Sequence, residues 1–444
     1  MHPYHRPMPQ PHALPEPNFT ARRERIARAI QDAVGDAIVL IGAGEPIPVP
    51  GGLDRVHPFN THPDYWYLTG EHRPGGVIAY DPAAGPRDGW TAFSVPQTAA
   101  ERTWEGEADV PGVPIAELSA WLAARRGRPI AMLGCPLPGV RADDAQTRTL
   151  ADLVWHARRV KDDAEVARIR HAAAITARTF ADLPNHIRPG VTERELRNRI
   201  LSGFIAQGAD GEGYDTIVGI GANAAVLHFT PGPKAAGTHD FVLIDAGAQH
   251  ARYTADVTRT FPVTPSDVSE TQRDFYNAVL SAQIRAVGAC KPGVEFHDLH
   301  RQAAEAMGAG LVAMGLLKGD PAELVDRGVM RLFFPHGLGH LVGLGVRDAS
   351  GRLPGRPQRP GPGGASIRLD LPLQPGYCVT IEPGLYLVPA LIDDPATRER
   401  FADAVRWSEI DKVRQEIQGV RIEDDVLVTD TEPDVLTAEI RKQL

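Results

Sequence analysis

The chain has 444 residues, 43% of them hydrophobic and 23% charged, and its formal net charge at pH 7 is −9. This length exceeds one typical hydrophobic core, so two domains are expected, and the acidic balance argues against a nucleic-acid partner, which would require basic patches. The three widely spaced cysteines include no CxxC pair. They indicate neither a disulfide framework nor a thiolate zinc site, and they fit a reducing cytoplasm. The sequence has no apolar run of about 18 residues and no signal-peptide core, so no membrane partner is expected.

The first part of the chain predicts a short tail and a small α/β domain. Residues 1–17 hold six prolines and three histidines and are expected to be a disordered tail. Thr20 can cap a helix in which Ile26, Ile30 and Val34 recur at i+4. Strands are then predicted at residues 37–42, 65–70, 75–81, 90–96 and 129–133, with a helix over 115–126. This alternation predicts an α/β domain over residues 18–157, followed by a polar, basic boundary.

The remaining residues, 158–444, contain a weak internal repeat. Asp162 and Thr192 each begin a capping box with a glutamate three residues later, which predicts two helix starts. The segment RPGVTEREL, beginning at Arg188, recurs 103 residues later as KPGVEFHDL. Each copy lies between a long predicted helix and a second one. We therefore expect two related halves that face each other, with a crevice between them suited to a ligand.

Two acidic residues lie on a predicted hairpin, FVLIDAGAQHARYTADVTRTF, at residues 241–261. A turn at residues 250–251 would set Asp245 directly opposite Asp256. Opposed residues of an antiparallel ladder have Cβ atoms ~5 Å apart on one face, and two carboxylates at that separation repel unless a cation lies between them. A solvated hairpin with scattered acids is the alternative. A metal site is favoured, because both aspartates follow apolar strand residues.

Three later segments can complete such a site. PHGLGHLVG contributes His336 and His340, and its glycines predict a loop or strand end, with one imidazole binding metal and the other serving the substrate. YCVTIEPG places Glu382 at the end of a predicted strand, and GVRIEDD places Arg421 and Glu423 on one strand face. Each of these residues taken alone also fits a structural role.

The combined set, Asp245, Asp256, His340, Glu382 and Glu423, offers four carboxylates and one imidazole. Two divalent ions would neutralise it, and the donor types favour Mn²⁺, Co²⁺, Fe²⁺ or Zn²⁺. Two such ions ~3.5–4 Å apart can lower the pKa of a bridging water and hold the oxyanion of an attacked carbonyl. Amide hydrolysis is therefore the expected chemistry.

Residues from about 158 to 429 resemble the pita-bread metallopeptidases, the superfamily of methionine aminopeptidase, aminopeptidase P and prolidase. The motifs IDAG, ADVTRTFPV, FPHGLGHLVGLGV, TIEPGLY and GVRIEDDV occur in the family's order. DYWYLTG and TWEGE in the first domain are similar to the aminopeptidase P and prolidase branch. The resemblance implies an α/β (α+β) architecture: a pita-bread catalytic domain with pseudo-twofold αβ halves, preceded by a smaller α/β domain. It also implies short peptide substrates and a homodimer or homotetramer.

The resemblance implies roles for the site residues. Asp245 is expected to chelate one ion, Asp256 and Glu423 to bridge both, and His340 and Glu382 to complete the other shell, with Glu382 also the general base. Further roles fall to residues around the metals: His228, in NAAVLHFTPG, and His336 are expected to act on the substrate or the tetrahedral intermediate, and Tyr214 and Arg421 to contact the substrate. Taken alone, His228 would fit a structural histidine.

The chain departs from the family at one position of interest. The family usually reads GLDVHDVG where this chain reads GLGVRDASG, so Arg347 replaces a histidine. Arginine cannot shuttle a proton but can bind a carboxylate through two hydrogen bonds. Arg368, fourteen residues before Glu382, matches the spacing at which prolidases place an arginine for the substrate's free carboxylate. The polar excursion at 390–418 is also prolidase-like. The segment 352–364 is expected to be a solvated excursion rather than a lid.

The favoured hypothesis is a cytoplasmic Xaa-Pro dipeptidase of the prolidase type that uses two divalent ions, with Mn²⁺ preferred. An Xaa-Pro aminopeptidase acting on longer peptides is one alternative. A carboxypeptidase-type variant that reads the substrate's C-terminal carboxylate through Arg347 and Arg368 is another. A non-catalytic peptide-binding protein is a remote third, suggested by the replaced histidine.

Overall fold

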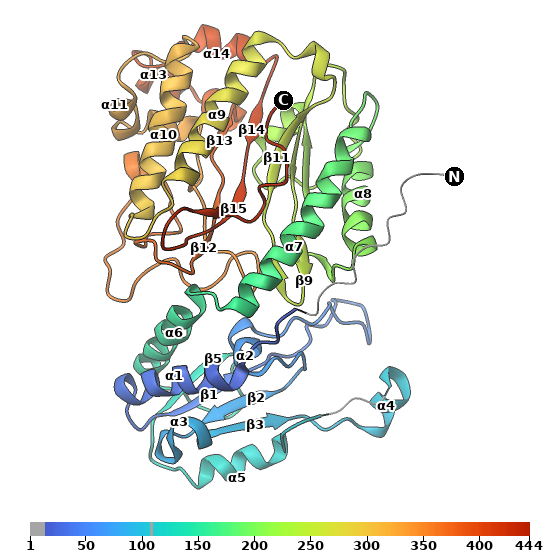
Figure 1. Cartoon of the computed structure of the whole chain (residues 1–444), viewed down its shortest axis with the longest axis vertical. Helices are drawn as coiled ribbons and strands as arrows, with labels where there is room; N and C mark the ends of the chain where they lie inside the picture. The colour runs from blue at the N-terminus through green and yellow to red at the C-terminus, as the bar shows by residue number, and fades with distance from the viewer. Residues whose placement is uncertain (1–13, 107–109) are drawn as a thin grey trace. The chain divides into compact units, whose positions relative to one another are not determined.

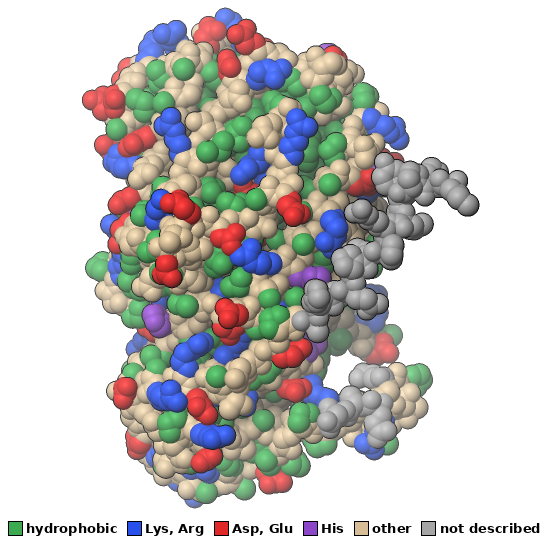
Figure 2. Space-filling model, in the orientation of Figure 1, with side chains coloured by type: hydrophobic (Ala, Val, Ile, Leu, Met, Phe, Trp, Pro, Cys, Tyr) green, Lys and Arg blue, Asp and Glu red, His purple; other side chains and the backbone are tan. Residues whose placement is uncertain are grey.

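The computed structural model describes residues 14–106 and 110–444 (Figure 1). They form two compact units, one spanning Glu16–Arg158 and the other built on Arg159–Leu444. Of the tail predicted at residues 1–17, residues 1–13 lie outside the described residues. On the face seen in Figure 2, basic and acidic side chains are interspersed. Within the described ranges, no helix has the length and apolar character needed to cross a membrane.

The smaller unit is an α/β domain built on one mixed sheet, as predicted. Its strand order is β4-β3-β2-β1-β5, and β1 pairs antiparallel with β2 but parallel with β5. The strands are β1 Ile38–Gly42, β2 Val77–Tyr80, β3 Trp90–Ser94, β4 Val113–Pro114 and β5 Ile130–Gly134. The α-helices are α1 Phe19–Ala33, α2 Pro63–Thr69, α3 Gly85–Asp88, α4 Ala99–Glu105, α5 Leu118–Ala123 and α6 Asp144–Arg159. Apolar residues of β1, β2 and β3 form its core.

Two local predictions in this unit are wrong. Residues 65–70, predicted as a strand, lie largely in helix α2. The helix begins at Pro63, whose fixed φ suits a first helical turn, and ends where Gly70 adopts φ 73°. These end signals outweigh the β propensity of the three consecutive aromatic residues, which are buried on the helix instead. The first helix also begins one residue earlier than predicted, and its cap is Asn18, whose side chain accepts the Ala21 N–H.

The internal repeat seen in the sequence is a structural repeat of the larger unit. Gly190 has φ 87° and donates its N–H to the Ala236 carbonyl at 2.8 Å, while Gly293 has φ 83° and donates to the Leu373 carbonyl at 2.8 Å. Each glycine precedes a helix that follows a longer one. The helices are α7 Asp163–Asp182 and α8 Glu193–Ala206 in the first half, and α9 Glu270–Gly288 and α10 Phe296–Ala313 in the second. The pseudo-twofold pair of halves is thereby confirmed.

Strands of both halves run between the α7/α8 pair and the α9/α10 pair in Figure 1. The first half contains β6 Gly211–Glu212, β7 Ile217–Ile220, β8 Phe241–Asp245, β9 Ala248–His250, β10 Tyr253–Thr254 and β11 Thr258–Pro262. The second contains β12 Cys378–Ile381, β13 Gly384–Tyr386, β14 Gly419–Arg421, β15 Asp424–Leu427 and β16 Asp434–Val435. Short helices α11 Pro321–Asp326, α12 Pro389–Ile392, α13 Pro395–Arg400 and α14 Trp407–Val413 complete the second half. Each half has its own apolar core, so the polar strand ends between them are free to form a site.

The Pro-rich excursion at residues 352–364 is tied to the start of α10. Arg356 Nη2 lies 2.7 Å from Glu295 Oε2, and Arg359 Nη2 lies 2.9 Å from Asp370 Oδ1. The excursion contributes no described residue to the lining of the cavity between the halves.

Acid sensitivity of the larger unit is expected from His300, on α10. Burial lowers its pKa from 6.5 to about 4. The unfolded chain therefore binds more protons between pH 6.5 and 4, so stability falls as the pH drops through this window. Between pH 7 and 5 we expect His300 to cost about 2 kcal/mol of unfolding free energy. Urea unfolding at both pH values should show this loss reduced by that amount in His300→Gln. The same loss as in the parent would contradict the expectation, and exposed His57, changed to Gln, is the control.

Candidate metal centre

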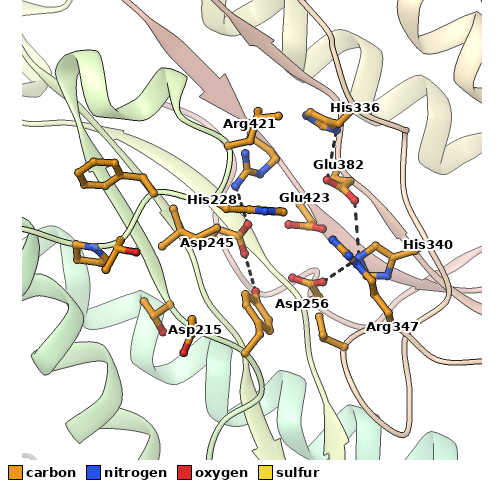
Figure 3. A pocket seen from close by; sticks show the side chains of 18 of the residues that line it. Asp215, His228, Asp245, Asp256, His336, His340, Arg347, Glu382, Arg421 and Glu423 are labelled. Atoms are coloured by element: carbon orange, nitrogen blue, oxygen red, sulfur yellow. Dashed lines mark hydrogen bonds and ion pairs between the residues drawn. The ribbon is translucent and has the colours of Figure 1, made fainter. Parts of the chain in front are cut away.

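A cavity of about 740 Å³ receives residues from both halves of the larger unit (Figure 3). Every site residue predicted from the sequence lines it. These are Tyr214, His228, Asp245, Asp256, His336, His340, Arg347, Arg368, Glu382, Arg421 and Glu423. The dispersed motifs therefore meet in one place.

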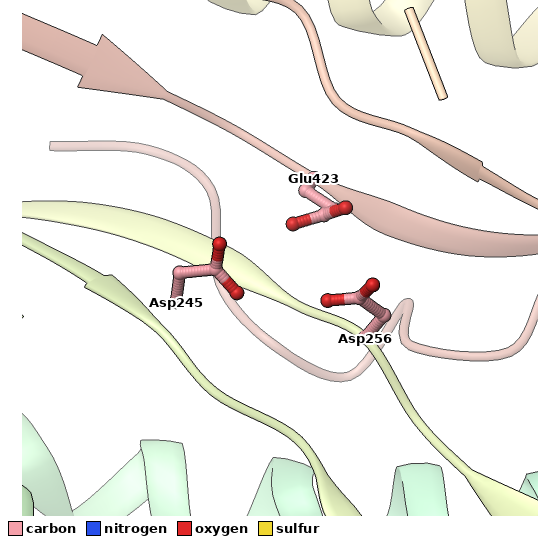
Figure 4. Close-up of side chains that lie close together, drawn as sticks. All are labelled: Asp245, Asp256 and Glu423. Carbon is pink, nitrogen blue, oxygen red and sulfur yellow. The ribbon is translucent and has the colours of Figure 1, made fainter. Parts of the chain in front are cut away.

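Three carboxylates that line this cavity lie close together (Figure 4). One oxygen each from Asp245, Asp256 and Glu423 lies within 4.8 Å of the others. Asp245 ends β8, Asp256 lies between β10 and β11, and Glu423 lies between β14 and β15. All three are buried, with relative exposures of 8%, 4% and 2%. Burial raises the pKa of Asp245 and of Glu423, and the charge of Asp256 raises both further.

The two aspartates meet in a different register from the one predicted. The turn predicted at residues 250–251 lies at residues 251–252, which have φ values of 46° and 73°. Asp245 consequently pairs with Thr258 rather than with Asp256. The error arose because two consecutive non-glycine residues occupy the left-handed region, which residue type does not signal.

Continuing this register places Gly247 opposite Asp256, so the two aspartates are diagonal neighbours on one face. A Cβ at Gly247 would lie 1.7 Å from the Ala255 carbonyl oxygen, so only glycine fits there. The backbone N–H of Asp256 donates to Asp425 Oδ2 at 2.9 Å, which fixes this non-strand residue. The two carboxylates therefore still lie close together, because their residues are diagonal neighbours on one face and the Asp425 side chain holds the Asp256 backbone in place.

His340 and Glu382 lie beside the three carboxylates. His340 Nε2 is 3.4 Å from Asp256 Oδ2 and 3.8 Å from Glu382 Oε1. His340 Nδ1 lies 3.0 Å from the Leu341 carbonyl oxygen, so it donates there and leaves Nε2 toward the acids. The neighbouring acidic groups, Asp256 above all, raise the pKa of His340 against the effect of its burial. Burial raises the pKa of Glu382 to about 7.

The segment from His336 to His340 is a loop, as its glycines predicted. A Cβ at Gly339 would lie 1.9 Å from the Thr380 carbonyl oxygen, so the loop can approach β12 this closely only with glycine. The His340 N–H donates to Thr380 Oγ1 at 3.0 Å. This contact holds His340 beside β12, and both histidines line the cavity.

Two residues predicted as substrate contacts both donate to Asp245. The Tyr214 hydroxyl donates to Oδ1 at 2.7 Å, and Arg421 Nη2 donates to Oδ2 at 2.6 Å. Arg421 Nε also donates to Thr258 Oγ1 at 3.0 Å, and that hydroxyl donates to Glu423 Oε2 at 2.6 Å. A chain of hydrogen bonds therefore orients two of the three clustered carboxylates.

Tyr386 is a site residue that the sequence analysis missed. Its hydroxyl accepts from Arg421 Nη1 at 2.8 Å and lies 2.8 Å from His336 Nε2. Because a guanidinium can only donate, the tyrosine proton is available for His336 Nε2, and the ring proton belongs on Nδ1, 2.8 Å from the Gly337 carbonyl. Burial lowers the pKa of His336 to about 3, consistent with a neutral ring. Strand alternation from Glu382 through position 384 could have signalled this tyrosine.

His228, Arg347 and Arg368 are exposed residues of the cavity wall. Within residues 14–106 and 110–444, the side chains of these three make no hydrogen bond or ion pair. Burial lowers the pKa of His228, and the positive charge of Arg347 lowers it further. Burial lowers the pKa of Arg368, and the positive charge of Arg347 lowers it further; both residues line the same cavity. These groups are available to a ligand.

The donor set fits divalent cations. Asp245, Asp256, Glu382 and Glu423 together bring four carboxylates, and His340 brings one imidazole nitrogen. Among the described cavity residues, Arg421 alone adds a buried cation in contact with them. One positive charge does not balance four carboxylates, three of them buried, whereas two divalent ions would supply the four charges needed to neutralise the carboxylates themselves. Carboxylate oxygens with one imidazole are ligands typical of Mn²⁺, Zn²⁺ and related ions.

Comparisons with known proteins agree with this donor set. Residues 167–430 match the model for metallopeptidase family M24, and residues 19–112 match the aminopeptidase P N-terminal domain. The chain is 29% identical to Xaa-Pro aminopeptidase of Escherichia coli over 96% of this chain and 95% of that protein. It is 32% identical to a probable Xaa-Pro aminopeptidase of Aspergillus niger, over 89% of this chain and 84% of that protein.

Solved structures give the same result. The chain is similar to aminopeptidase PepP of Pseudomonas aeruginosa with a TM-score of 0.77 and 27% identity, covering 97% of both chains. It is similar to E. coli aminopeptidase P with the inhibitor Pro-Leu, with a TM-score of 0.76 and 26% identity, covering 96% of this chain and 95% of that one. The chain therefore belongs to metallopeptidase family M24, in its aminopeptidase P group, and is a metallo-exopeptidase with the family's dinuclear metal site.

Proposed function

We propose that this chain is an Xaa-Pro aminopeptidase, which removes the N-terminal residue that precedes proline in a peptide. The relatives named Xaa-Pro aminopeptidase support this, because they match nearly the whole chain, including the smaller unit. The same relatives favour this activity over the Xaa-Pro dipeptidase that the sequence analysis preferred. The observation that carries the proposal is the buried carboxylate cluster of Asp245, Asp256 and Glu423 within reach of His340 and Glu382.

The proposed ligand arrangement is the one that the resemblance to the pita-bread metallopeptidases implies, and the convergence of the carboxylates supports it. Asp245 would chelate one ion, and Asp256 and Glu423 would bridge both ions. His340 and Glu382 would complete the set of ligands on the second ion. Tyr214 and Arg421 hold both oxygens of Asp245, so we assign them first to orienting this ligand. Mn²⁺ is the proposed ion, since oxygen donors predominate.

Bound ions would polarise the scissile carbonyl and lower the pKa of the attacking water. Glu382 has a pKa raised to about 7 by burial, which suits a general base near neutral pH. His228 is unengaged among the described residues and exposed to the cavity, so it can donate to the oxyanion. The nitrogens of His336 are already engaged with Tyr386 and Gly337, and its Nδ1 lies 3.6 Å from Glu382 Oε2. We therefore give His336 no proton-transfer role and keep it as a proposed substrate contact through its ring.

One observation favours a second candidate function. Arg347 and Arg368 share a space in the cavity wall and have no partner among the described side chains. Two such guanidinium groups can bind a substrate's C-terminal carboxylate. This favours a dipeptidase or a carboxypeptidase-type exopeptidase, both of which must recognise that carboxylate.

A panel of four Mn²⁺-supplemented peptide substrates tests these alternatives. It comprises an Xaa-Pro dipeptide, a longer Xaa-Pro peptide, its C-terminal amide and its N-acetylated form. The aminopeptidase proposal expects cleavage of the longer peptide and its amide, and loss of cleavage on acetylation. Cleavage confined to the dipeptide would favour the dipeptidase, and cleavage of the acetylated peptide would favour the carboxypeptidase. No hydrolysis with any divalent ion would contradict all three.

Removing one arginine should reveal carboxylate recognition. Under the second candidate function, Arg347→Ala should raise KM for short free-acid peptides about tenfold, because charged hydrogen bonds contribute about 1.5–3 kcal/mol. KM for the matching amides should not change. Steady-state kinetics on the acid and amide pair measures this, with exposed Arg188, outside the cavity, changed to Ala as control. Equal effects on acid and amide would contradict the assigned role.

The proposal includes short peptides as substrates, a cytoplasmic location and a homodimer or homotetramer. Pro-Leu is the inhibitor bound in an E. coli aminopeptidase P structure, which supports a peptide ligand for this chain. Light scattering after size exclusion would give the number of subunits.

A further inference from the structure

We propose that the buried ion pair between Lys161 and Asp348, together with Arg159, positions Arg347 in the cavity. This inference rests on the proposed contact of Arg347 with the substrate's carboxylate. Arg159 is the last residue of α6 and Lys161 lies between α6 and α7, so both are far from Arg347 in sequence. They are positioning residues, because neither is among the residues that line the cavity.

The loop that carries Arg347 needs external support. Arg347 is exposed and has no partner among the described side chains. The position of its guanidinium group therefore depends on the backbone of the loop that carries it. Two positions further on, Ala349 adopts φ 48°, a conformation that non-glycine residues adopt only when their surroundings impose it. Such a backbone persists only where neighbouring groups determine it.

The ion pair provides this support next to Arg347. Lys161 Nζ lies 3.1 Å from Asp348 Oδ2, and both side chains have 0% exposure. A Cβ at Gly343 would lie 2.5 Å from Lys161 Cε and 2.6 Å from Asp348 Oδ2, so the pair packs against the start of the loop. The Asp348 N–H donates to the Leu341 carbonyl at 3.0 Å, which closes the loop around Arg347.

Arg159 holds the outgoing side of the same loop. Its Nε donates to the Ser350 carbonyl at 2.8 Å, and its Nη2 donates to the Arg352 carbonyl at 2.5 Å. Lys161 is itself fixed by its N–H, which donates to the Gly376 carbonyl at 2.9 Å. Two basic residues at the end of α6 and just after it thus hold both sides of the loop.

A buried ion pair at this place is better explained by geometry than by stability. Taking two charges out of water offsets most of their attraction, so a buried pair adds little net stability over apolar residues. What the pair does provide is a defined distance between the Lys161 segment and the residue that follows Arg347. The direction of Arg347 relative to the cavity then depends on that distance.

The test compares acid and amide forms of one Xaa-Pro peptide with the full-length, Mn²⁺-loaded protein. In Asp348→Asn, we expect the ratio of kcat/KM for acid over amide to fall about tenfold, because a displacement near 1 Å is enough to lose an oriented contact. The change should lie in KM for the acid, with kcat on the amide kept. Arg159→Lys, which retains the charge but cannot span two carbonyls, should lower the same ratio even if Asp348→Asn folds poorly.

Two controls separate positioning from a general loss of structure. Asp64→Asn breaks another buried ion pair, in which Arg158 Nη1 lies 2.6 Å from Asp64 Oδ1, and should lower Tm without changing the ratio. In an Arg347→Ala background, Asp348→Asn should lower the ratio no further. If Arg347→Ala itself leaves the ratio unchanged, the proposed contact is wrong. If Arg347→Ala lowers it while Asp348→Asn and Arg159→Lys do not, the positioning inference is overturned.

Discussion

Glu423→Gln is expected to lower kcat/KM on an Xaa-Pro peptide by about 10³-fold or more. Glu423 is the proposed bridge between two ions, and a bound metal contributes several kcal/mol to stabilising the charge of the transition state. Gln keeps the size of the side chain and can still accept the Thr258 hydroxyl, now 2.6 Å from Glu423 Oε2. The loss should therefore come from the metal centre rather than from packing. Initial rates at saturating Mn²⁺ measure it.

Thermal unfolding with and without metal provides the control for this variant. Burial and the neighbouring acids Asp256 and Glu382 raise the pKa of Glu423, so its carboxyl takes up a proton more readily than an exposed one when no metal is bound. The metal-free unfolding free energies of parent and variant should consequently agree within about 1 kcal/mol. Mn²⁺ at 1,000 times its Kd should stabilise the parent by about 4 kcal/mol and the variant by much less. Full activity in the variant, or equal stabilisation by Mn²⁺, would contradict the bridging role.

Glu382→Gln is expected to lower kcat by about 10²- to 10⁴-fold, the usual contribution of a positioned general base. The physical reason is that an amide cannot take the proton of the attacking water. Burial raises the pKa of Glu382 to about 7 in the metal-free protein, and bound cations would lower it. The base is active when deprotonated, so kcat of the metal-loaded parent should fall as the pH drops through the lowered pKa of Glu382, below 7.

A pH profile distinguishes this role from a purely structural one. The acidic fall in kcat should disappear in Glu382→Gln, whereas it should persist in Glu305→Gln, a change on α10 outside the cavity. An unchanged acidic limb in Glu382→Gln, or a loss of activity below about tenfold, would assign the base to another group.

The sequence was most informative where chemistry is concentrated in short motifs. IDAG, TIEPG and GVRIEDD each place an acid at a strand end, so their convergence depends on the fold class and not on exact register. The shift of the turn to residues 251–252 therefore moved the partner of Asp245 from Asp256 to Thr258 without separating the aspartates. The fold class and family are confirmed, while the roles of individual residues stay predictions.

Local patterns failed where capping or distant contacts decide the outcome. Residues 65–70 read as a strand because aromatic residues favour sheets, but Pro63 and Gly70 bound a helix there. Tyr386 and Lys161 escaped notice for a different reason. Their partners, Arg421 and Asp348, are far away in sequence. Strand alternation after Glu382 could place Tyr386 on the same face, but no spacing rule connects Lys161 with Asp348, which meet only in the folded chain.

Metal content is the most direct test of the dinuclear centre. The protein should be loaded with Mn²⁺, freed of loosely bound ions by desalting, and analysed for metal and protein by mass spectrometry and amino-acid analysis. The parent should retain two ions per chain, as four carboxylates and one imidazole require for charge balance, and Glu423→Gln should retain at most one. Retention of no ion by the parent, or the same content in both proteins, would contradict a dinuclear site bridged by Glu423.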